Sequence, residues 1–136
     1  MAFDGITLAL VKQEILSLGD GVRVDRIHQP SGDEIILSFR YRGGSRRYLL
    51  SASASTARIH SVKSTPENPM TPPMFCVLLR KHLASAKLVD IEQPGLDRVL
   101  HFRFEGANDI GDLTRPSLHL EIMGRYSNLI LTDGEG

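Results

Sequence analysis

The chain has 136 residues, of which 41% are hydrophobic and 24% are charged, and these values are typical of one globular domain with a buried core. Sixteen Lys and Arg balance sixteen Asp and Glu, which excludes the excess positive charge that drives indiscriminate binding to phosphate backbones, so any nucleic-acid contact must be local. No apolar run approaches the roughly 18 to 20 residues of a membrane-spanning helix, and the N-terminus lacks a basic segment followed by an apolar one, so we expect a soluble, cytoplasmic protein.

The first predicted element is a helix between Asp4, which can cap its first turn, and Gly19, which can end it. Its apolar residues recur at helical spacing and must pack on another element: Leu8, Val11, Ile15 and Leu18.

A run of strands follows the helix. Turn signals at residues 30–33 and at Gly43-Gly44 separate segments of alternating or β-branched character, which predicts an antiparallel meander. The predicted strands are Val22 to Gln29, Glu34 to Tyr41, Arg46 to Ser51 and Ala57 to Val62.

A second helix is predicted to begin at Thr71-Pro72, because four prolines between Ser64 and Pro73 exclude regular structure before it. Its apolar residues keep helical spacing: Phe75, Leu78, Leu79 and Leu83. Its C-terminal half is basic, where cations complement the helix dipole, and contains Arg80, Lys81 and His82.

The last third returns to strands, predicted at Leu88 to Gln93, Arg98 to Phe104, Ser117 to Met123 and Asn128 to Thr132. Two main helices and about eight strands predict an α+β domain with antiparallel sheets. Residues 132–136 read as a hairpin turn without its returning strand, so we expect the chain to be part of a longer protein.

Cysteine and histidine usage does not indicate a metal or disulfide site. Cys76 has no partner for an internal disulfide and lies in an apolar stretch, where a buried small hydrophobe is expected. The five histidines lack the short spacing that metal ligands on one element usually show, so we expect no metal and no cofactor.

A basic hairpin is the most conspicuous charged feature, with Arg40, Arg42, Arg46 and Arg47 around the tip Gly43-Gly44. These cations could contact an RNA backbone, or they could simply protect an exposed sheet edge by charge. The sequence does not favour one interpretation over the other. Arg80 and Lys81 could add to the same field, but their position relative to the hairpin cannot be read from sequence.

Several segments, spread in order over nearly the whole chain, together resemble the N-terminal domain of the NFACT family, which includes RqcH, NEMF and fibronectin-binding-protein-A-like proteins. They are Phe3 to Ile6, Arg26 to Pro30, Leu49 to Ser51, Pro73 to Leu83, Gln93 to Arg98, and Leu120 to Leu131.

The resemblance implies that residues 1–136 form the N-terminal domain of a multidomain ribosome-quality-control factor. Such a factor acts on the large ribosomal subunit that holds a stalled peptidyl-tRNA, and it recruits alanyl-tRNA so that the nascent chain gains a C-terminal alanine tail. Peptidyl transfer belongs to the ribosome in that scheme. The domain would then bind tRNA and have no enzymatic activity of its own.

The resemblance also implies two tRNA-binding motifs, here Asp97-Arg98 and Glu121-Ile122-Met123. Asp97-Arg98 follows the turn Gln93-Pro94-Gly95 and opens a predicted strand, so both side chains should be displayed at a sheet end. The planar guanidinium suits a phosphate or a base edge, and the carboxylate can orient it or accept a hydrogen bond from a base. Without the resemblance, an ordinary turn-flanking pair would be the better interpretation, and Ile122 can be core, which leaves Glu121 and Met123 for a partner.

Two rival functions follow from the same resemblance. The first is binding of fibronectin, which requires the protein outside the cell. The second is base excision, because the NFACT N-terminal fold resembles the N-terminal domain of the formamidopyrimidine-DNA glycosylases. Those enzymes use an N-terminal proline amine followed by an acid, whereas this chain begins Met1-Ala2-Phe3-Asp4, so we expect no such activity.

Overall fold

The computed structural model describes residues 5–53, 57–63, 74–122 and 127–132. The elements in these residues are α1 (Gly5–Leu16), β1 (Arg23–Ser31), β2 (Glu34–Tyr41), β3 (Gly44–Ser51), β4 (Arg58–Val62), α2 (Met74–Leu83), β5 (Lys87–Glu92), β6 (Val99–Ala107), β7 (Leu113–Thr114), β8 (Ser117–Glu121) and β9 (Asn128–Thr132). Every described strand pair is antiparallel, in the order β4-β3-β2-β1-β5-β6-β8-β9, with β7 paired to β6. The predicted α+β class is confirmed.

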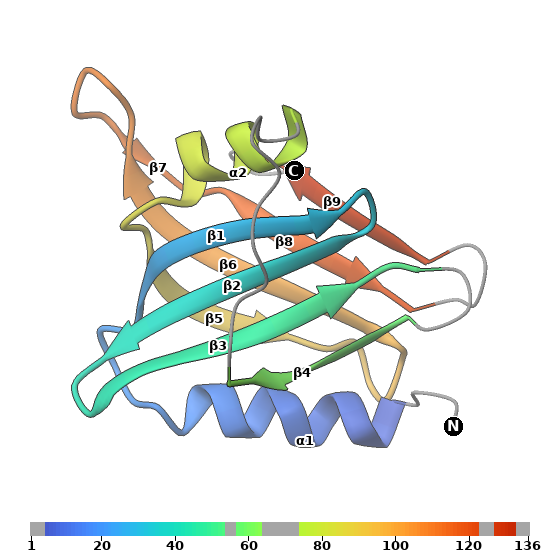
Figure 1. The fold of residues 1–136 in the computed structure, drawn as a ribbon. Coiled ribbons are helices and arrows are strands. Elements are labelled where there is room, and N and C mark those ends of the chain that lie inside the picture. Colours follow the sequence, from blue (N-terminus) through green and yellow to red (C-terminus); the bar gives the residue numbers. More distant parts are fainter. Residues whose placement is uncertain (1–4, 54–56, 64–73, 123–126, 133–136) are drawn as a thin grey trace.

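The sheet has two halves, β1 to β4 and β5 to β9, and they enclose one core. Figure 1 shows β1, β2 and β3 crossing in front of β6 and β8, with α1 along one side and α2 on the other. The helix α1 contacts β4 from the first half and β5 and β6 from the second. The two halves are joined where β1 pairs with β5, through the register pair Arg23 and Lys87 and the hydrogen bond from the Leu88 amide to the Val22 carbonyl (2.7 Å).

The core consists of apolar side chains from both halves and both helices. Its largest fully buried members are Tyr48, Phe39, Phe102, Phe104, Leu8, Ile15, Ile35, Ile36, Leu37, Leu50, Ile59 and Leu79. Alternate residues of β6 point inward, as in a half-buried strand, whereas residues 35–39 of β2 are all buried, so both faces of that strand are covered. Cys76 is buried in this core, which confirms the prediction made for it.

The predicted apolar stripe of α1 is confirmed, since Leu8 and Ile15 are fully buried and Val11 and Leu18 pack against the core. The helix ends at Leu16, before the predicted stop at Gly19. Its last turn tightens, because the amide of Gly19 donates to the carbonyl of Leu16 (3.2 Å), and Gly19 itself has a positive φ of 101°. Asp4, the predicted cap, lies outside the described residues.

The strands β2 and β9 have the predicted bounds, and the other predicted strands differ at their ends. β6 continues to Ala107, beyond the predicted end at Phe104, because Gly106 and Ala107 pair with Thr114 and Leu113 of β7. β7 was not predicted, since two residues are too few to show an alternating pattern. The described part of α2 begins at Met74, and the predicted start at Thr71-Pro72 lies outside the described residues.

Among the described residues, no helix is long and apolar enough to cross a membrane.

Candidate nucleic-acid interface

The Asp97-Arg98 pair lies in the connection between β5 and β6. The amide of Asp97 donates to the Pro94 carbonyl (2.9 Å), and Gly95 has a φ of +54°, which glycine adopts without strain. This confirms the predicted turn, although β6 begins at Val99, one residue later than predicted. Both Asp97 and Arg98 are exposed.

The loop that carries this pair is fastened to the first turn of α1. The Gln93 side-chain amide donates one hydrogen bond to the carbonyl of Gly5 (2.8 Å) and another to the carbonyl of Asp97 (2.8 Å). Gly5 packs directly on the loop, because a Cβ added there would lie 1.7 Å from the Leu96 carbonyl oxygen. Gln93 and Gly5 therefore position the pair, a role that the sequence analysis did not assign to them.

The structure brings the second motif next to the first. Val99 and Glu121 are register partners of β6 and β8, and the amide of Ile122 donates to the Arg98 carbonyl (2.8 Å). Ile122 is 3% exposed and belongs to the core, whereas Glu121 is half-buried. Met123 lies outside the described residues. Two segments more than twenty residues apart in sequence thus form one end of the sheet.

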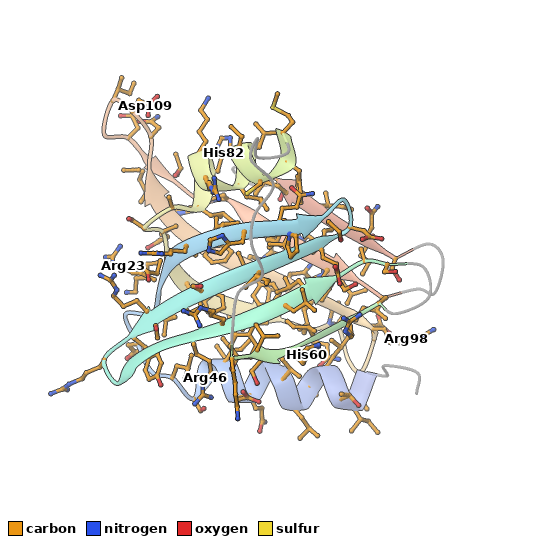
Figure 2. All side chains as sticks on the ribbon, in the orientation of Figure 1. Arg23, Arg46, His60, His82, Arg98 and Asp109 are labelled. Atoms are coloured by element: carbon orange, nitrogen blue, oxygen red, sulfur yellow. The ribbon has the colours of Figure 1, made fainter. Side chains whose placement is uncertain are left out.

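The charged groups of this end are available to a partner. Within the described part of the chain, the side chains of Asp97, Arg98 and Glu121 make no hydrogen bond or ion pair, since Asp97 and Arg98 are held through their backbones. Figure 2 shows Arg98 at the edge of the molecule, pointing away from the sheet. The Arg98 guanidinium can bind phosphate, and the carboxylates of Asp97 and Glu121 can accept hydrogen bonds from base amino groups.

The basic hairpin lies at the opposite end of the sheet, where β2 meets β3 (Figure 1). Three of its arginines are engaged within the chain, in the contacts Arg40 Nη2 to Asp25 Oδ1 (2.9 Å), Arg46 Nη1 to Glu14 Oε1 (3.4 Å) and Arg47 Nη1 to the Lys63 carbonyl (3.0 Å). Arg42 is exposed at the tip, and its side chain makes no hydrogen bond or ion pair within the described residues. The hairpin therefore does not present four free cations on one surface.

Arg80 and Lys81 form a third location. Arg80 donates from Nε (3.0 Å) and Nη2 (2.8 Å) to the Ile27 carbonyl, which ties α2 to β1, while Lys81 is exposed. A cavity of about 300 Å³ beside this contact is lined by Asp25, Arg26, Ile27, His28, Arg80 and Ala84. In Figure 1, α2 and the hairpin tip lie apart, but Asp25, the ion-pair partner of Arg40, lines the same cavity as Arg80.

Comparison with known proteins identifies the family. A family model described as the NFACT N-terminal and middle domains matches residues 4–136. The chain belongs to the NFACT family. Among curated NFACT relatives, it is 44% identical over 133 residues to the Rqc2 homolog RqcH of Bacillus subtilis (strain 168), covering 98% of this chain and 23% of the relative. It is 29% identical to the ribosome quality control complex subunit NEMF of Homo sapiens, covering 98% of this chain and 12% of that protein.

Solved structures of similar proteins have the same fold. The N-terminal domain of the fibronectin-binding protein PavA from Streptococcus pneumoniae matches with a TM-score of 0.93 and 37% identity, covering 98% of this chain and 51% of that one. The fibrinogen-binding protein from Staphylococcus aureus matches with a TM-score of 0.84 and 34% identity, covering 98% of this chain and 47% of that one. The chain spans about a quarter, or less, of the length of the curated relatives it matches, with 23% for the Bacillus protein.

Proposed function

We propose that this chain is the tRNA-binding module of a ribosome-quality-control factor that recruits alanyl-tRNA to a stalled large ribosomal subunit, where the nascent chain receives an alanine tail. The observation that carries the proposal is the meeting of Asp97-Arg98 with Glu121 at one end of the sheet, with all three side chains uncommitted within the described residues. The names of the RqcH and NEMF relatives support the ribosomal setting. Peptidyl transfer stays with the ribosome, and the module itself is not an enzyme.

The charge of the chain favours recognition at a small site over a broad electrostatic surface. Lys and Arg equal Asp and Glu, sixteen of each, so long-range attraction to RNA is weak and affinity must come from local contacts. Weak binding by one module suits a factor whose other contacts on the ribosome share the load, because linked sites raise the effective concentration of each.

The test is binding of alanine tRNA to the 136-residue chain at two salt concentrations, comparing the unaltered protein with Asp97→Ala/Arg98→Ala. The double variant removes one charge of each sign and leaves the backbone hydrogen bonds of the loop in place. A matched control is Asp112→Ala/Arg115→Ala, which also removes one acid and one base from exposed positions. These positions follow the loop that contains Asp109, far from Arg98 in Figure 2.

We expect salt-sensitive binding that falls at least about tenfold in the Asp97/Arg98 variant, a loss typical of one charge-assisted contact, and that is unchanged in the control. Equal binding by all three proteins would show that the motif is structural in this chain and would overturn the assigned site. If none of the three proteins bound tRNA at low salt, the isolated chain would not have the proposed function.

Fibronectin binding is a second candidate, supported by the PavA structure, whose protein is described as fibronectin-binding. An immobilised fibronectin surface with this chain in solution tests it directly. We expect no saturable binding, and saturable binding that tRNA does not displace would favour the adhesin function.

A further inference from the structure

Two histidines from neighbouring strands converge on the outer face of the sheet. His101 of β6 and His119 of β8 are register partners, and their neighbours Leu100, Phe102, Leu118 and Leu120 point into the core. The Nδ1 atoms of the two rings lie 2.6 Å apart, and the rings meet edge to face. Because they are eighteen residues apart in sequence, no short spacing could reveal this pair.

The second ring nitrogen of His119 is also held. Its Nε2 lies 2.9 Å from the Thr132 hydroxyl oxygen on β9. When Nε2 carries the proton and donates it to Thr132, the Nδ1 lone pair of His119 is directed toward His101. Metal-bound histidines typically donate their other ring N–H to an oxygen, which fixes the tautomer and the ring orientation.

We propose that His101 and His119 chelate a divalent transition-metal ion of the Zn²⁺ class through their Nδ1 atoms. Zn–N bonds of about 2.0 to 2.1 Å at a tetrahedral angle place two nitrogens about 3.3 Å apart. The observed 2.6 Å between the nitrogens needs to open by about 0.7 Å, and both rings are half-buried. The proposal departs from the expectation, drawn from histidine spacing, that the chain has no metal site.

A carboxylate of the same face can complete the site. Glu121 follows His119 by two residues on β8, so it points to the same side of the sheet, and its carboxylate has no partner within the described residues. Glu92 is in register with His101, but its Oε1 accepts a hydrogen bond from Arg103 Nε (2.8 Å). Glu121 is therefore the third ligand, with water in the remaining position, since imidazole and carboxylate both suit zinc.

The site is weaker than a structural zinc centre. Among the described residues, no three His, Cys, Asp or Glu side chains are already gathered around a metal position. Glu121 must change its side-chain rotamer to reach the ion, and only the two imidazoles are preorganised. We therefore expect one saturable site per chain that a strong chelator removes.

The test is a calorimetric titration of the chelator-treated 136-residue chain with Zn²⁺ at neutral pH. We expect one ion per chain, and His101→Gln or His119→Gln should each lower the affinity at least about tenfold, as loss of a ligand or of its outer partner typically does. His82→Gln is the matched control, because His82 lies on α2, away from the pair. Thr132→Val should also weaken binding about tenfold, although it leaves both ligands, because it removes the oxygen that orients His119.

A second measurement keeps the proposal testable if a histidine variant does not fold. In the unaltered chain, Zn²⁺ should shift the NMR signals of the His101 and His119 rings and leave those of His60 and His82 unchanged. Absence of saturable binding at millimolar Zn²⁺, an affinity unchanged from that of the unaltered chain in the two glutamine variants, or shifts spread over all the histidines would each overturn the proposal and leave the pair as a hydrogen bond between strands.

Discussion

Gly5 has no space for a side chain. A Cβ at this position would lie 1.7 Å from the Leu96 carbonyl oxygen, a backbone atom that can move only with its loop. We expect Gly5→Ala to lower the free energy of unfolding by about 1 to 3 kcal/mol, as overpacking does, and to weaken tRNA binding by displacing Asp97-Arg98. Urea denaturation and the tRNA titration measure the two effects. Gly32→Ala, where no atom lies within 4 Å of the added Cβ, is the control and should change neither.

Tyr48 joins the β2–β3 hairpin to α1. Its hydroxyl donates a hydrogen bond to Glu14 Oε1 (2.8 Å). Burial is the larger cause and this bond the next in raising the pKa of Tyr48 from 10.0 to about 12. Because the folded state holds the proton more tightly than the unfolded state, this contribution to stability is complete below pH 10 and is lost as pH rises toward 12.

Tyr48→Phe should remove that part of the alkaline loss of stability and should lower the free energy of unfolding at neutral pH by about 1 to 3 kcal/mol, because the hydrogen bond is to a carboxylate. Denaturation curves measured between pH 8 and 12 check both expectations. A variant with the same pH dependence as the unaltered chain would show that Tyr48 is not the titrating group.

At the scale of the element, the β5–β6 connection behaves as one clamped unit. A single side chain, Gln93, donates to Gly5 on α1 and to Asp97 within the loop. We expect Gln93→Ala to reduce tRNA affinity several-fold while lowering the free energy of unfolding by only about 1 to 2 kcal/mol, since two hydrogen bonds at the surface are lost. The control is Gln13→Ala on the exposed face of α1. Unchanged affinity in Gln93→Ala would mean that Asp97 and Arg98 need no positioning from the loop.

The whole molecule has one core shared by two halves of the sheet, so the halves should unfold together. Leu37 on β2 and Phe102 on β6 are both fully buried. We expect Leu37→Ala to cost about 2 to 5 kcal/mol and Phe102→Ala about 3 to 5 kcal/mol. Each should lower hydrogen-exchange protection in all the described strands, because a shared core unfolds cooperatively. Protection lost only in the half that carries the substitution would show two independently stable units.

The sequence by itself determined the local elements of this protein. Apolar spacing placed α1 and α2, and turn residues such as Gly43-Gly44 separated the strands, because periodicity and turn chemistry depend only on near neighbours. The Pro94–Asp97 turn and the burial of Cys76 were predicted for the same reason. Asp97-Arg98 and Glu121-Ile122-Met123 were selected by resemblance to a family, and composition or spacing alone did not distinguish them from an ordinary sheet end.

Only the tertiary structure decided which distant groups meet. The β1–β5 pairing joins the halves, the Ile122 amide reaches the Arg98 carbonyl, and His101 faces His119. It also engaged three of the hairpin's arginines, and Arg80, with partners that the sequence could not identify. The physical reason is that pairing between strands distant in sequence depends on how the whole core closes, whereas turns and local spacing can set only the register of neighbouring strands in a hairpin.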